Sequence, residues 1–73
     1  MALKNTIKVQ RAIHNLTQAE LAERIGVSRQ TINAIEANKY VPSTLLALRM
    51  AKVFNVSVED FFQLDEDVNS TKN

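Results

Sequence analysis

The sequence predicts an all-α domain of five short helices followed by an acidic and polar tail. The predicted helical segments each open at a hydroxyl or amide side chain, and most close at Gly or Asn, which are typical helix ends. The chain has 73 residues, 45% of them hydrophobic, with one Gly and one Pro, so it accommodates one small domain and not two. We assign residues 1–64 to this domain and residues 65–73 to the tail, which we expect to be mobile.

The first two helices are predicted at about residues 5–14 and 17–26. Asn15 can adopt the left-handed conformation that ends the first. The second opens on a capping box, in which the Thr17 hydroxyl serves the amide of Glu20 and the Glu20 carboxylate reaches back. It closes at Gly26. The apolar side chains at helical spacing are Val9, Ala12, Ile13 and Leu16 in the first helix, and Leu21, Ala22 and Ile25 in the second.

The remaining helices are predicted at residues 28–37, at 44–54 and shortly after residue 57. Ser28 opens the third, and Asn38 follows it in the left-handed conformation. Ser43 caps the fourth, which is apolar almost all round, so we expect it to be the central buried helix. Ser57-Val58-Glu59-Asp60 caps the short fifth, whose apolar residues are Val58, Phe61 and Phe62.

Composition removes several classes of function. The chain has no Cys and no Cys/His cluster, so disulfides and a structural zinc are excluded. Gly26 stands alone, which excludes the glycine-rich loops that bind nucleotides. His14 is the only candidate general base and nothing nearby completes a catalytic set, so we interpret it as a helix-end histidine and expect no enzyme.

We expect no cofactor, no metal and no small-molecule ligand either. Asp65-Glu66-Asp67 lacks the glycine turn of a calcium loop. No apolar run approaches the ~18 residues of a membrane span, and the first residues lack the apolar middle of a secretory signal. These features predict a cytoplasmic protein that does not associate with a membrane.

Charge is divided unevenly along the chain. Residues 1–52 contain eight Lys and Arg against three Glu, a net of +5, whereas residues 53–73 contain one Lys against five Asp and Glu, a net of −4. A basic body with an acidic tail suggests a surface that faces a polyanion. The alternative is ordinary solvation of a small surface.

Residues 18–37 have the pattern of a helix-turn-helix. Ala22 is small enough for two helices to cross closely, Gly26 supplies the positive φ of the turn, and Val27 fills the angle between the helices. On a helical wheel of residues 29–37, Ile32 and Ile35 face inward. The outward arc has no carboxylate and consists of Arg29, Gln30, Asn33, Ala34 and Ala37.

This outward arc has the chemistry of a surface that reads base pairs. Arg can form a bidentate pair with guanine, and Gln or Asn with adenine, in a major groove wide enough for a helix. The small side chain of Ala34 permits close approach to the bases. The alternative is that Arg29, Gln30 and Asn33 only solvate a helix, but the turn pattern, the missing acids and the basic body favour the first interpretation.

Residues 17–36 have the sequence TQAELAERIGVSRQTINAIE. This segment resembles the phage-repressor-like, or xenobiotic-response-element, helix-turn-helix family, and the resemblance continues through Lys39-Tyr40-Val41-Pro42-Ser43. The resemblance covers about residues 5–64. It implies a five-helix, lambda-repressor-like DNA-binding domain, usually a homodimer that regulates transcription. We therefore expect a dimeric repressor that reads a palindromic operator with the helix at residues 28–37. Some short members also pair their chain ends as strands, which would join Leu3 to Gln63 and Leu64 here.

The resemblance also assigns roles to individual residues. It implies base contacts by Arg29, Gln30, Asn33 and Ala34, and backbone contacts by Gln18, Thr31, Lys39 and Tyr40. The role of Gln18 is physically reasonable, because the start of a helix presents free amides and a positive dipole end to phosphate. For Lys39 and Tyr40 the alternative is a solvated loop with Tyr40 lying on the core.

Three positions depart from the family pattern. Asn15 and Asn38 stand where glycine is commoner, so the turns there are less defined. Gln10 occupies a position that is usually apolar, so we expect the first helix to be shifted or partly exposed at that point.

Two further expectations concern how the domain is held together. Arg11 and Glu36 are expected to form a largely buried ion pair, which the family often has; the alternative for Arg11 is a phosphate contact. A dimer surface is expected at the apolar residues near the end of the domain, Val56, Val58, Phe61, Phe62 and Leu64. The alternative is that the two Phe side chains close the core of one chain. The competing function is a protein-interaction module, such as an antitoxin or adaptor, in which DNA binding is secondary.

Overall fold

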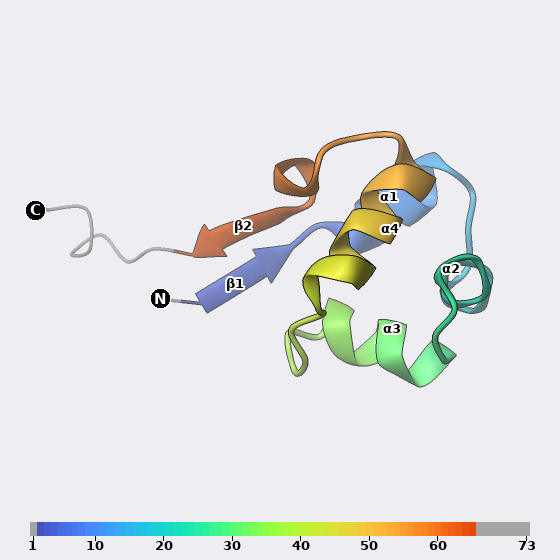
Figure 1. Cartoon of the computed structure of the whole chain (residues 1–73), viewed down its shortest axis with the longest axis horizontal. Helices are drawn as coiled ribbons and strands as arrows, with labels where there is room; N and C mark the ends of the chain where they lie inside the picture. The colour runs from blue at the N-terminus through green and yellow to red at the C-terminus, as the bar shows by residue number, and fades with distance from the viewer. Residues whose placement is uncertain (1, 66–73) are drawn as a thin grey trace, which may run out of the picture.

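The computed structural model describes residues 2–65 and shows four α-helices with a short two-stranded sheet (Figure 1). The predicted tail lies outside the described residues except for Asp65. The elements in chain order are β1 (Ala2–Asn5), α1 (Ile7–Ile13), α2 (Gln18–Ile25), α3 (Arg29–Glu36), α4 (Thr44–Phe54), a 3-10 turn η1 (Val58–Asp60) and β2 (Phe62–Asp65). The first four predicted helices are present, but the fifth predicted helix is only one 3-10 turn, because the chain enters β2 directly after it.

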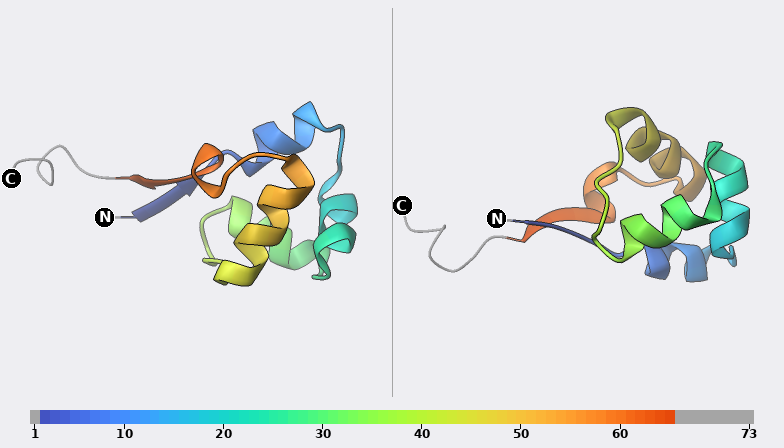
Figure 2. Two further views of the ribbon diagram at one scale, coloured as in Figure 1. Left: turned by 45° about the horizontal axis from the view of Figure 1, so that its top comes forward. Right: turned by 90° about the horizontal axis from the view of Figure 1, so that it is seen from below.

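The two ends of the domain pair as antiparallel strands, as the resemblance implied. Leu3 lies opposite Leu64, and Lys4 lies opposite Gln63. The backbone N–H of Thr6 donates to the carbonyl of Phe61 at 2.9 Å, next to the last pair of the ladder. The strands extend to one side of the helices (Figures 1 and 2), so the pairing closes the helical domain at the point where both ends of the chain leave it.

The predicted helix ends are confirmed for α2, α3 and α4. The side chains of Thr17, Ser28 and Ser43 each accept a hydrogen bond from a backbone N–H in the first turn of the helix that follows. Gly26 ends α2 at φ 79°. Asn15, Asn38 and Asn55 all have φ near 60°, the left-handed conformation that Asn tolerates better than most residues. Local side-chain chemistry therefore determines where these helices begin and end.

The predicted buried face of α1 is wrong. Val9 and Ile13 are 55% and 66% exposed, and Ala12 is exposed as well, whereas Ile7 is fully buried. The face turned toward the domain contains Gln10 and Arg11, which are half-buried. Leu16, beyond the helix, is buried as expected. The error arises because polar side chains occupy the inner face, so apolar spacing alone indicates the outer one.

The expectation that α4 is buried all round is also wrong. Its inner face packs Met50, Ala51 and Phe54 into the core. Leu45 and Leu48, one turn apart on the outer face, are 57% and 56% exposed. α4 is therefore a covering helix with an apolar outer surface over its first half.

The core lies between the four helices and the base of the hairpin. Phe54 contacts Phe61 edge to face at 5.3 Å between ring centroids, and Phe61 contacts Phe62 at 5.1 Å. The ring of His14, at the end of α1, stacks on Phe54. The other large, fully buried side chains are Ile7, Leu21, Ile25, Ile32, Ile35 and Met50. None of the helices that the structure describes is long and apolar enough to cross a bilayer.

Candidate nucleic-acid interface

The turn between α2 and α3 has the geometry that the sequence pattern predicts. The backbone N–H groups of Gly26 and Val27 both donate to the carbonyl of Ala22, at 2.9 and 3.0 Å, which turns the chain sharply. Arg49 of α4 donates to the carbonyl of Ile25 at 3.1 Å, so α4 holds the end of α2. Ile32 and Ile35 are buried beneath α3. α3 is thus anchored along one side, and its other side is available to a ligand.

The outer face of α3 presents the side chains expected to read bases. Arg29, Gln30 and Asn33 are exposed and Ala34 is half-buried. The first turn of α3 contains no acidic residue. This face therefore offers a guanidinium and two carboxamides with no carboxylate among them to repel a phosphate backbone.

The only acidic residue of α3, Glu36, is turned toward α1. Its carboxylate accepts hydrogen bonds from Arg11 Nε at 2.6 Å and from Arg11 Nη2 at 3.2 Å. The two side chains are 15% and 11% exposed, and Arg11 also donates to the carbonyl of Leu16 at 3.1 Å. The structure thus brings the expected ion pair together and shows Arg11 bonded to Glu36 rather than free for phosphate.

Gln18 links this ion pair to the outer face of α3. Its Nε2 donates to Glu36 Oε1 at 3.0 Å, and its Oε1 accepts from Asn33 Nδ2 at 3.4 Å. The carboxylate of Glu36 fixes which end of the Gln18 amide points toward Asn33, because only the amide nitrogen can donate to it. We did not predict this connection, because residues 18, 33 and 36 lie on two helices whose contact is set by the fold.

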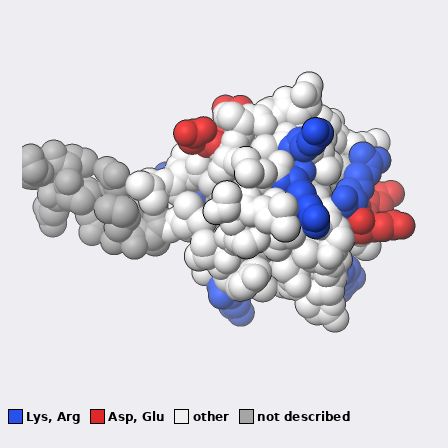
Figure 3. Space-filling model, viewed as in Figure 1, with Lys and Arg blue, Asp and Glu red and all other residues white. Residues whose placement is uncertain are grey.

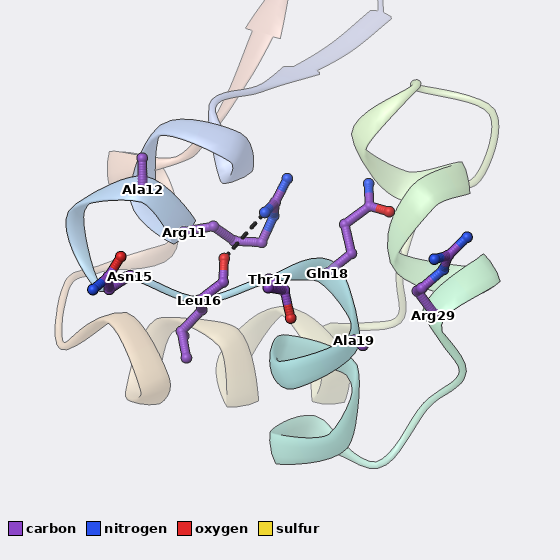
Figure 4. Close-up of a pocket in the computed structure, with 8 residues that line it drawn as sticks. All are labelled: Arg11, Ala12, Asn15, Leu16, Thr17, Gln18, Ala19 and Arg29. Atoms are coloured by element: carbon purple, nitrogen blue, oxygen red, sulfur yellow. Dashed lines mark hydrogen bonds between the residues drawn. The ribbon is translucent and has the colours of Figure 1, made fainter.

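A hollow of about 350 Å³ lies beside this network, between the end of α1 and the start of α2 (Figure 4). In this view Gln18 lies between Arg11 and Arg29. The residues that line it are Arg11, Ala12, Asn15, Leu16, Thr17, Gln18, Ala19 and Arg29. Because the Arg11 guanidinium is paired with Glu36, the positive groups that this hollow offers to an anion such as a backbone phosphate are the Arg29 guanidinium and the first turn of α2.

The remaining predicted backbone contacts lie around α3. Thr31 is half-buried, and its hydroxyl lies 2.9 Å from that of Ser28. Lys39 and Tyr40 are exposed in the loop that follows α3, and the backbone N–H of Lys39 donates to the carbonyl of Ala34 at 2.9 Å. These side chains therefore lie at the two ends of the helix that carries the expected base contacts.

Asn5 is a residue near this surface that we did not predict. Its Nδ2 donates to the carbonyl of Ile35 at 3.0 Å and to Oδ1 of Asn38 at 2.9 Å. It thereby adds a second hydrogen bond to a carbonyl at the C-terminal end of α3, which also accepts from the backbone N–H of Asn38, and ties β1 to that end. No local sequence signal indicates such a contact, because Asn5 is 30 positions from Ile35 and 33 from Asn38.

Comparison with known proteins agrees with this geometry. A helix-turn-helix family model matches residues 7–61, which is most of the chain. The chain belongs to the phage-repressor-like helix-turn-helix family. It is 55% identical, over 89% of its length and 98% of the relative's, to a Methanocaldococcus jannaschii protein named an uncharacterized HTH-type transcriptional regulator.

Two solved structures resemble the fold. The crystal structure of a Bacteroides fragilis protein has a TM-score of 0.75 and 33% identity, covering 84% of this chain and 98% of that one. A chain of the complex between the SinR and SinI proteins has a TM-score of 0.69 and 31% identity, covering 92% of this chain and 64% of that one. This helix-turn-helix chain is therefore a DNA-binding transcriptional regulator, and its family is not one of enzymes.

In this helix-turn-helix regulator, the residues expected at the dimer surface lie in different environments. Phe61 and Phe62 are buried within one chain, so they do not lie on the open dimer surface where we expected them. They fill the core because η1 and β2 fold back over Phe54. Val56 and Val58 are half-buried, and Leu64 is exposed. Within residues 2–65, no group of three or more His, Asp or Glu side chains could hold a metal ion.

Proposed function

We propose that this chain is a homodimeric repressor that occupies a palindromic operator and reads it with α3. The observation that carries the proposal is the outer face of α3, where Arg29, Gln30 and Asn33 are exposed with no acidic side chain among them. In this proposal Arg29 pairs with guanine, Gln30 and Asn33 pair with adenine, and Ala34 lets the helix approach closely.

The backbone contacts set the register of the domain on the duplex. Gln18 is assigned to phosphate at the start of α2, and Thr31, Lys39 and Tyr40 to phosphates at the two ends of α3. Such contacts position the protein without reading sequence. The hollow beside Gln18 supports this assignment, because it offers an anion the Arg29 side chain and the amides at the start of α2.

The first experiment selects bound duplexes from a random pool with the full chain. The consensus should contain two inverted half-sites about 34 Å apart, the spacing of two helices on one face of a duplex. Arg29→Ala should reduce discrimination at one base pair by about 1–3 kcal/mol. Lys39→Ala should weaken all sequences alike. Arg24→Ala removes the same charge at the far end of α2 from Gln18 and is the matched control.

Equal losses from the Arg29 and Lys39 variants on every duplex would overturn this division of roles. Chemical-shift mapping that leaves α3 unperturbed by the selected duplex would overturn the proposal itself. Affinity should also fall with salt, with a slope near −0.9 for each phosphate contacted.

A second candidate function is a protein-interaction module, such as an antitoxin or adaptor, for which DNA binding is secondary. One observation favours it: the similar SinR and SinI structure is a complex of two proteins. Binding to the selected duplex that is weak, insensitive to salt and unchanged by Arg29→Ala would favour this candidate over the first.

A further inference from the structure

An apolar face covers the first half of α4 and the base of the hairpin. It surrounds a cavity of about 230 Å³ that is lined by Leu3, Pro42, Thr44, Ala47, Leu48, Val58 and Phe62. Leu45 and Leu48, both more than half exposed, stand on the outer side of α4 beside this cavity. We use the name α4 face for the surface that consists of the residues lining this cavity and Leu45. Single exposed apolar residues are normal, but apolar side chains gathered around a cavity mark an interaction site.

Charged side chains border the α4 face on two sides, with opposite signs. In Figure 3, acidic atoms lie over η1 and basic atoms over the second half of α4, with uncharged atoms between them. The exposed acids of η1 are Glu59 and Asp60, and the exposed cations of α4 are Arg49 and Lys52. The Asp60 carboxylate already accepts a hydrogen bond from Ser57, and the Arg49 guanidinium already donates one to the carbonyl of Ile25. Glu59 on the acidic border and Lys52 on the basic border are therefore the side chains best placed to contact another molecule.

We propose that the α4 face is the surface on which a second copy of this chain docks, related by a two-fold axis. This inference rests on the proposed function, which requires a dimer, and it adds which surface of the chain forms the dimer contact. A two-fold contact joins the same patch of both copies, so the patch must be complementary to itself. The α4 face meets this requirement in shape, because each copy presents both a cavity and projecting Leu side chains that can enter the cavity of the other.

The charges select a second copy over another occupant. If the two faces meet about an axis that is vertical in the view of Figures 1 and 3, the acidic border of each copy lies against the basic border of the other. A uniformly acidic or basic peptide would instead meet a like charge along one border. Two copies therefore satisfy both borders at once.

The same axis places the reading helices correctly. α3 lies along the lower edge of the view in Figure 1, below α4. A rotation about a vertical axis leaves both copies of α3 at that lower edge, on one side of the dimer. A dimer that binds two half-sites on one face of a duplex must have both copies of α3 on the same side. Charge matching and the placement of α3 thus point independently to one axis.

The test measures the dimer dissociation constant of the full chain by sedimentation over a range of concentrations. Leu48→Asp should raise it by about 100-fold or more, because it places a charge at the centre of the contact. Ile13→Asp is the matched control: Ile13 is an equally exposed apolar residue on α1, which lies on the opposite side of the molecule from α4 (Figure 2). It should change the constant by less than about 3-fold. Thermal melting of both variants checks that they fold.

A charge exchange tests the axis. Glu59→Lys and Lys52→Glu should each raise the dissociation constant by about 5-fold, and the two together in one chain should return it to within about 2-fold of the starting value. A double variant that is worse than either single one would overturn the proposed axis. Equal effects of Leu48→Asp and Ile13→Asp, or a chain that stays monomeric throughout, would overturn the α4 face.

The two proposals can fail separately. Binding to a duplex with a single half-site does not require the dimer, so its dependence on Arg29 tests the reading helix alone. A monomeric chain whose half-site binding still depends on Arg29 would remove the α4 face and leave α3 as the reader. A dimer broken by Leu48→Asp with no Arg29-dependent binding would support the face and remove the proposed DNA reading.

Discussion

The reading end of this molecule and its hairpin end are held together by different kinds of contact. At the reading end, caps and turns between near neighbours place α2 and α3, and a polar network centred on Glu36 joins them to α1. At the hairpin end, strands from opposite ends of the chain pair over a cluster of aromatic rings. The difference shows that the surface proposed to face DNA depends on oriented polar contacts, whereas the domain is closed by non-local apolar burial.

The largest effect is expected at the hairpin end. Phe61→Ala removes a fully buried ring and should cost about 3–5 kcal/mol of unfolding free energy, comparable to the whole stability of a domain this small. Leu64→Ala, on the exposed part of β2, should cost less than about 0.5 kcal/mol. Urea unfolding followed by circular dichroism measures both.

Protein concentration then separates the core from the dimer. If Phe61 belongs to the core of one chain, the loss is the same at every concentration, and Phe61→Leu gives a smaller loss of about 1 kcal/mol. A loss that disappears when the protein is dilute would place the ring in an interface instead, and would contradict its burial in the single chain.

A slightly smaller effect is expected at the reading end. Glu36→Ala leaves the Arg11 guanidinium mostly buried without its partner, which should cost about 3 kcal/mol. Glu23→Ala, an exposed carboxylate on α2, is the control and should shift the denaturation midpoint little. Equal shifts for the two variants would mean that the ion pair does not hold α1 against α3.

The helix-turn-helix was predictable because its signals are local. A capping box at Thr17, a glycine at residue 26 and a serine cap at residue 28 each act within four residues, and all appear where expected. The Arg11 and Glu36 pair was expected from the family resemblance. The Gln18 bridge was not, because no spacing in the chain indicates which side chains a crossing of two helices brings together.

The burial of α1 and α4 was predicted less well for a physical reason. Periodicity identifies an apolar stripe, but it does not say whether that stripe faces this chain or another surface. In α1 the inner face carries Gln10 and Arg11, of which Arg11 belongs to the polar network with Glu36, so Val9 and Ile13 remain outside. In α4 the outer leucines lie beside a cavity.

Asn5 connects the two ends, and its variant tests whether they are coupled. Asn5→Ala removes the hydrogen bonds that Asn5 donates to the Ile35 carbonyl and to Asn38, together with the one that it accepts from the backbone N–H of Ile7, and should cost about 1–2 kcal/mol. Thr6→Ala is the control, because the Thr6 side chain makes no capping hydrogen bond. Hydrogen exchange should become faster in the last turn of α3 as well as in β1. Faster exchange confined to β1 would show that the hairpin and the reading helix are independent.

The smallest effect compares two asparagines with the same backbone conformation. Asn38 and Asn55 have φ of 62° and 58°, so Gly should relieve strain equally at both. Asn38 also accepts a hydrogen bond from Asn5, whereas Asn55 is only the exposed end of α4. Asn38→Gly should therefore be less stable than Asn55→Gly by about 1 kcal/mol in urea unfolding. Equal values would mean that the hydrogen bond between Asn5 and Asn38 contributes nothing, and β1 would then be tied to the end of α3 only through the bond from Asn5 to the Ile35 carbonyl.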